Sequence, residues 1–192
     1  LPSPHALAAF RPMQDRCKSL FRSIFPIQSD FEFTETYAEI WGEIINIVFV
    51  SLNTQDSAVL KYSDVFRTIE YHIRNEQLMS IFQIVKILDH MKMKYRELYI
   101  PNNPYKEKTN VFAYYFLKSV LMFHINEFIE WCHIHNGSLQ FKNENMKSFF
   151  EFIIQRFQSE NYLKLIDFFD SWFTKNKNNL FVTRSLRLSI TE

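Results

Sequence analysis

Apolar residues recur every three or four positions along most of this chain, which is the spacing of an amphipathic helix. The clearest stripe begins near Thr34 and continues to Leu52. Proline, which ends helices, is absent from 27–100 and from 105–192. The pattern predicts seven helices, at about residues 12–24, 34–52, 57–74, 77–98, 110–134, 144–157 and 161–173.

Helices joined by short connections predict an all-α fold. The segments 144–157 and 161–173 have the lengths and the short connection of an antiparallel hairpin. No internal repeat with a period of about 33–47 residues accompanies them. We therefore expect an irregular helical bundle or a degenerate, solenoid-like array of helical hairpins, with about seven helices. The helix 110–134 is apolar almost all round, which predicts a central buried position.

The distribution of breakers predicts one domain with irregular ends. Residues 1–11 are expected to be an irregular lead-in, and 12–175 a single all-α domain with an internal loop at 99–109. Residues 176–192 are expected to be a basic C-terminal tail or a last element, because 180–190 fits a strand, a helix or a tail equally well. The chain begins at Leu1 rather than Met, from which we expect a domain excised from a larger protein.

Glycine is scarce, with 2 residues where average usage of about 7 % predicts roughly thirteen. Dinucleotide fingerprints, P-loops and nucleophile elbows need closely spaced glycines, so these motifs are excluded. Gly42 lies one turn from Ala38, which predicts close approach of another helix, with a ligand contact as the alternative. Gly137, in Asn136-Gly137-Ser138, is expected to end a helix.

One polar cluster invites a catalytic or metal-binding interpretation. It consists of His124, Glu127, Glu130, Cys132, His133 and His135. The H-E-x-x-H order is absent, and His124 and His135 are about 16 Å apart along one helix. We interpret the histidines as capping or solvated groups. The sequence thus predicts no catalytic residue, no metal ligand, no cofactor and no small-molecule substrate, and the protein is not expected to be an enzyme.

Cysteine usage and hydropathy bear on the cellular compartment. Cys17 and Cys132 are expected to be two buried free thiols, the alternative being a single bridge. The longest uncharged run, between Glu43 and Asp56, is too short to cross a bilayer. These features predict an intracellular location, cytoplasmic or nuclear.

The net charge of +1 hides a segregation of charge. Glu35, Glu39 and Glu43 recur at i,i+4 and predict an acidic ridge that an external or internal cation would relieve. Basic residues gather near the C-terminus, namely Lys175, Lys177, Arg184 and Arg187. The acidic and the basic residues could simply be two solvated surfaces, or the basic C-terminal tail could fold back onto the acidic ridge. The functional interpretation is an acidic patch that docks a basic partner segment, with the basic residues forming a second contact.

Aromatic residues exceed what a core of this size needs, with 21 Phe, 9 Tyr and 3 Trp. We expect some of them at the surface, among them Phe31, Phe33, Tyr71, Tyr114 and Phe152. This predicts a non-catalytic protein-interaction or scaffold domain that binds a peptide or helix in an aromatic-lined groove, or self-associates. The alternative is a helical RNA-binding module that uses Lys86, Lys92, Lys94, Arg96 and the basic residues of 175–187.

Overall fold

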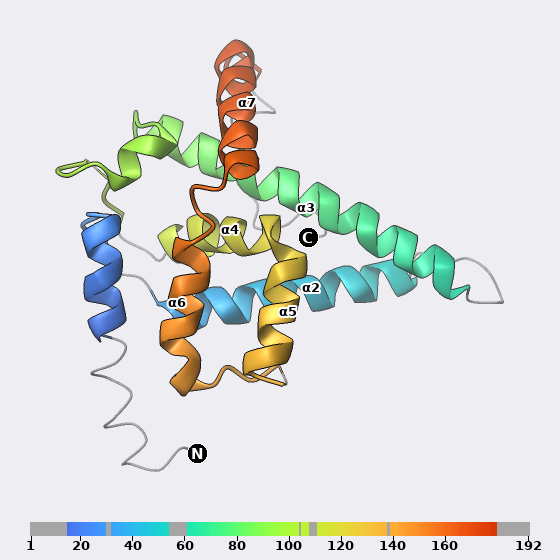
Figure 1. Ribbon diagram of the computed structural model, residues 1–192. Coiled ribbons are helices and arrows are strands. Elements are labelled where there is room, and N and C mark those ends of the chain that lie inside the picture. Colours follow the sequence, from blue (N-terminus) through green and yellow to red (C-terminus); the bar gives the residue numbers. More distant parts are fainter. Residues whose placement is uncertain are drawn as a thin grey trace.

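The computed structural model describes residues 15–29, 32–53, 61–103, 105–107, 111–137 and 139–179. All regular structure in these ranges is helical (Figure 1). Residues 15–24 form the first helix. It is followed by α2 (Phe33–Asn53), α3 (Tyr62–His90), α4 (Lys118–Phe123), α5 (Ile125–His135), α6 (Met146–Ile154) and α7 (Glu160–Asn176). Two 3₁₀ turns (Tyr95–Tyr99, Asn143–Asn145) and a π-helical segment (Phe112–Leu117) complete the order.

The prediction of an all-α fold with about seven helices is confirmed for the described residues, but the chain is divided into helices differently at two places. The helices expected at 57–74 and 77–98 are one continuous helix, α3, of 29 residues. Neither Asn75 nor Glu76 prevents helix continuation, and Glu76 points into the interior with 1 % exposure. The helix ends at His90, because Lys92 adopts a left-handed conformation with a φ of 57°.

The helix expected at 110–134 bends in the middle. His124 has a φ of −101° and a ψ of 35°, which separates α4 from α5. In Figure 1, α5 runs at a steep angle to α4. The central position predicted for this segment is confirmed for its first half, because every residue of 116–122 is buried and α4 packs against α2 and α3.

The hairpin expected from 144–157 and 161–173 is wrong. Instead of folding back on α6, α7 packs against α3, and the two contact through aromatic rings. The ring of Phe82 on α3 lies 5.7–5.9 Å from the rings of Trp172, Phe169 and Phe173. α6 packs on α5 instead, where Trp131 and Phe149 are 5.3 Å apart. The arrangement in Figure 1 is an irregular bundle.

Much of the aromatic surplus fills the core. Phe33 and Phe152 are buried, so the expectation that they lie at the surface is wrong. Tyr71 is 64 % exposed, as expected, and Tyr114 is half-buried. Phe31 lies outside the described residues. Buried rings meet edge to face, an arrangement that stabilises beyond the area it buries.

The cysteines and glycines test four local expectations. Cys17 and Cys132 are both free and buried, as predicted. Gly137 ends α5 with a φ of 63°, and its N–H donates to the carbonyl of Cys132. The prediction for Gly42 is wrong for the described residues, because a Cβ built there would meet nothing within 4 Å.

Among the described residues, no helix combines the length and apolarity needed to cross a membrane. The expectations for 1–11 and 180–190, and the predicted docking residues Arg184 and Arg187, fall outside the described ranges.

Candidate functional site

An apolar groove of about 320 Å³ runs between α3 and α7. It is lined by Asn75, Leu78, Met79, Phe82, Phe168, Phe169 and Trp172. Three of these side chains remain substantially in solvent, with 59 % of Phe168, 43 % of Leu78 and 38 % of Trp172 exposed. Large apolar side chains gathered in one groove are typical of an interaction site.

Helical periodicity places these residues together. Positions 75, 78, 79 and 82 recur at i, i+3, i+4 and i+7, and so they share one face of α3. α7 carries two apolar stripes. One stripe (Tyr162, Ile166 and Phe173) is buried, whereas the other, with Phe168 and Trp172, forms a wall of the groove.

Ion pairs tether α7 near the groove, although none of the paired residues lines it. Asp170 accepts from Lys94 at 2.6 Å, and Asp167 accepts from Arg96 at 2.8 Å. Lys177, just beyond α7, pairs with Asp89 near the end of α3. These contacts join α7 to the end of α3 and to the turn that follows it, so the groove exists before any partner binds.

The charges beside the groove are positive. Arg74 is exposed one turn before Leu78, and Lys175 is exposed one turn after Trp172. Of the predicted basic docking residues, Lys175 therefore lies beside the groove, whereas Lys177 is engaged with Asp89.

The acidic ridge is not the exposed surface that the spacing predicts. Glu35 and Glu39 are half-exposed on α2, but Glu43 is buried with 7 % exposure. The prediction of Glu43 as a docking residue is therefore wrong. A helix turn of about 100° per residue lets an i,i+4 series drift around the helix, and here it carries Glu43 to the interior face.

Glu43 belongs to a buried ionic cluster. Its carboxylate lies 2.9 Å from the ammonium of Lys118, and the two side chains are 4 % and 1 % exposed. Burial raises the pKa of Glu43 to about 8; Lys118 opposes this shift and neighbouring Glu76 adds to it. Lys118, on α4, is thus an internal cation for one member of the predicted ridge, Glu43.

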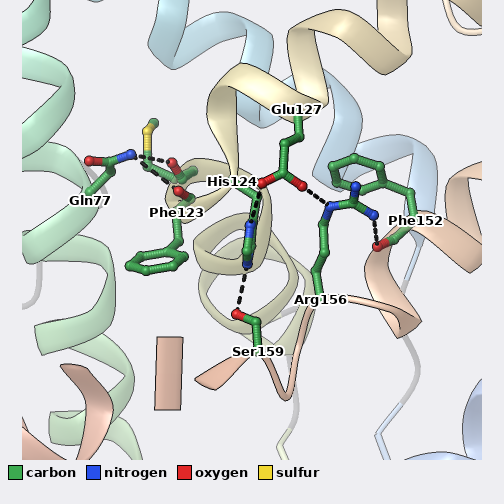
Figure 2. A network of polar contacts seen from close by, with 8 residues as sticks. Gln77, Phe123, His124, Glu127, Phe152, Arg156 and Ser159 are labelled. Atoms are coloured by element: carbon green, nitrogen blue, oxygen red, sulfur yellow. Dashed lines mark hydrogen bonds and ion pairs between the residues drawn. The ribbon is translucent and has the colours of Figure 1, made fainter. Parts of the chain in front are cut away.

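A second polar network surrounds the bend at His124 (Figure 2). His124 Nδ1 lies 3.2 Å from Glu127 and Nε2 lies 3.0 Å from Ser159 Oγ. Partial burial raises the pKa of Glu127, but hydrogen bonds from Arg156 and His124 outweigh this and lower it, so it is a carboxylate. A carboxylate only accepts, so a neutral His124 carries its proton on Nδ1, and Nε2 accepts from Ser159.

This order of groups is that of a hydrolytic triad, and the same groups are tied to the elements around the bend. Arg156 lies over the ring of Phe152 and ties the carboxylate of Glu127 to α6. Gln77 donates to the carbonyls of Met122 and Phe123, just before the bend (Figure 2). Since a bend removes helical partners from such carbonyls, the network satisfies the groups that the bend releases.

The remaining histidines of the polar cluster point elsewhere. His135 stacks on Trp131 at 4.8 Å and contacts Ser148, whereas His133 is exposed. Within the described part of the chain, no three metal-ligating side chains converge.

The basic residues of the RNA-binding alternative are largely engaged. Lys86 is buried against the ring of Phe82. Lys94 and Arg96 pair with the two aspartates of α7. A phosphate backbone would have to displace those carboxylates.

The sequence predicts an aromatic-lined groove but not its place between α3 and α7, because apolar stripes do not show which helices pack together. The one available indication was the second stripe of α7, since a helix that needs only one buried face does not need Phe168 and Trp172. Comparisons with family models, curated proteins and solved structures gave no match for this chain.

Proposed function

We propose that this protein is a non-catalytic interaction module that docks an amphipathic helical segment of a partner protein in the groove between α3 and α7. The observation that carries the proposal is the exposure of Phe168, Leu78 and Trp172 along one apolar groove. Aromatic side chains at the centre of such grooves supply most of the binding free energy in helix-in-groove recognition.

Charge complementarity favours an acidic occupant. Arg74 and Lys175 flank the apolar residues from opposite helices, and both are exposed. A partner helix with apolar residues at i, i+3 or i+4, and i+7, and with acidic residues beside them, would fill the groove and pair with both cations. The docking site that we propose is therefore the groove between α3 and α7. Glu35 and Glu39, which the sequence suggested, do not line it.

The fixed geometry of the groove supports binding without rearrangement. Because ring contacts of Phe82 with Phe169 and Phe173 already pack α7 against α3, docking of a partner needs little ordering of α7. The proposal keeps an intracellular setting, which two free thiols support.

Selection from a displayed library of helical peptides tests this function. The wild-type chain is the bait, and the variant Phe168→Ser is used for counter-selection. Phe168 is 59 % exposed, so the variant should fold normally. We expect enriched peptides with the apolar spacing above and an excess of Asp and Glu. Failure to enrich any peptide over the counter-selection, or enrichment of basic peptides only, would contradict the proposal.

Self-association through the same groove is a distinct outcome. Sedimentation equilibrium of the wild type and of Phe168→Ser separates the two. If both proteins are monomers, the groove is left for a different protein. If the wild type is a dimer and Phe168→Ser is a monomer, the occupant of the groove is a second copy of this chain.

A further inference from the structure

A second apolar surface lies on the side of α2 that faces away from the core. The buried stripe of α2, which includes Ile40 and Ile47, occupies the opposite side. The residues of this surface, which we call the outer face of α2, are all exposed and alternate in spacing between four and three: Ala38, Gly42, Ile45, Phe49 and Leu52. Contact positions of a coiled coil have this spacing, with an apolar residue about every 3.5 positions.

The outer face holds large apolar side chains in solvent. Phe49 is 61 % exposed, Leu52 is 38 % exposed and Ile45 is 37 % exposed. In Figure 1, the C-terminal part of α2 extends past α5 with α3 beside it. A helix of a globular protein needs one apolar side to pack on the core. A second apolar side with coiled-coil spacing is therefore typical of a contact with another helix.

Gly42 lies within the outer face, at a position where the described fold does not need glycine. A Cβ at this residue would meet nothing within 4 Å, and glycine inside a helix costs about 1 kcal/mol relative to alanine. Together with Ala38, one turn earlier, Gly42 leaves the backbone of α2 open to close approach. A docked helix can pack against the backbone here and against Phe49 and Leu52 farther along.

The charge beside the outer face is acidic. Glu35 and Glu39 adjoin its N-terminal end and are half-exposed, and Glu39 has no ion pair among the described residues. Residues 24–60 contain no Lys or Arg, so α2 of a second copy would bring no cation to these carboxylates. A helix with Lys or Arg beside its apolar residues would pair with them. Charge complementarity therefore favours a different, basic helix over self-association.

We infer that the outer face of α2 docks a basic amphipathic helix of another protein, with apolar residues at coiled-coil spacing and Lys or Arg beside them. This surface is separate from the groove between α3 and α7, and its charge preference is the opposite one. The inference does not depend on the groove. With both surfaces occupied, the chain links an acidic helix to a basic one.

Fluorescence anisotropy with two synthetic peptides, each about three heptads long, tests the inference. Both peptides carry Leu at the two contact positions of every heptad, and the flanking positions are Lys in one peptide and Gln in the other. We expect the full chain to bind the Lys peptide at least about tenfold more tightly than the Gln peptide. This preference should shrink as salt is added, because salt screens exposed charges. Equal affinity for the two peptides would overturn the inference.

Variants locate the binding of the Lys peptide on the chain. Phe49→Ser should weaken binding at least about tenfold, because it removes the most exposed aromatic ring of the outer face. The double reversal Glu35→Lys with Glu39→Lys should weaken it similarly and reduce its salt dependence. Phe168→Ser in the groove and Glu130→Lys at an exposed position of α5 are the matched controls. Each control should change the affinity by less than about threefold.

Urea unfolding of each variant checks that the fold is retained, and if the double reversal does not fold, Phe49→Ser alone decides. Wild-type affinity in the folded outer-face variants, or a larger loss in Phe168→Ser, would show that the peptide binds elsewhere and would overturn the inference. Sedimentation equilibrium supplies the remaining outcome. A wild-type dimer that Phe49→Ser dissociates would also overturn it, because the occupant of the outer face would then be a second copy of this chain.

Discussion

At the residue scale, Lys118 is the only cation that faces the carboxyl group of Glu43 within the described interior. The sequence indicates that Lys118 is unusual, because it is the one charged residue in the otherwise largely apolar segment 111–123. It could not indicate the partner, since Glu43 belongs by spacing to a surface ridge. Which member of that ridge turns inward depends on how α2 packs against α4, and this is a tertiary property.

The substitution Lys118→Met should destabilise the fold at pH 7 by about 3–5 kcal/mol, because it breaks the buried ion pair with Glu43. The loss should be smaller at pH 5, where Glu43, whose pKa is raised by burial, takes up a proton more readily. Urea unfolding at the two pH values measures the difference. Lys164→Met removes an exposed i,i+4 pair with Glu160 and should change stability by less than about 0.5 kcal/mol.

The two glycines should respond in opposite ways to replacement by alanine. Gly42→Ala should stabilise the protein by about 0.5–1 kcal/mol, because the helix has room for the methyl group and the unfolded chain loses freedom. Gly137→Ala should destabilise it by about 1 kcal/mol, because alanine disfavours a φ of 63°. Thermal unfolding of both variants checks the signs. Destabilisation by Gly42→Ala would show a contact at that position.

At the element scale, periodicity located the helices better than it located their interruptions. The stripe from Thr34 to Leu52 predicted α2 almost to the residue. The continuity of α3 and the bend at His124 were missed because neither depends on a helix-breaking residue. The bend persists because side chains from other elements, Gln77 among them, satisfy its carbonyls.

The substitution Gln77→Ala should therefore destabilise the fold by about 1–3 kcal/mol, since it leaves the carbonyls of Met122 and Phe123 without their donor. Gln155→Ala, at an exposed position, is the control. Hydrogen exchange should also show faster exchange at the bend in Gln77→Ala. If the two variants were equally stable, the network in Figure 2 would not hold the bend.

At the scale of the whole molecule, the helical class followed from the sequence but the packing partners did not. The pattern of 161–173 predicts a helix correctly. It does not predict which helix packs against it, because α3 and α6 both have apolar faces. Ring contacts at Phe82 place α7 on α3, and ion pairs at Asp167 and Asp170 join α7 to the turn that follows α3. The groove is a consequence of that choice, and so it could not be predicted from stripes alone.

The most direct test of the groove is the affinity of one selected peptide for three forms of the protein, measured by fluorescence anisotropy. The forms are the wild type, Phe168→Ser in the groove, and Ile134→Ser on α5, where the isoleucine is 66 % exposed. We predict that Phe168→Ser weakens binding at least about tenfold, as expected for an aromatic residue at a binding hot spot. Ile134→Ser should change the affinity by less than about twofold, because an exposed apolar residue outside the contact contributes little. Equal affinities for all three forms, or a greater loss in Ile134→Ser, would contradict docking between α3 and α7.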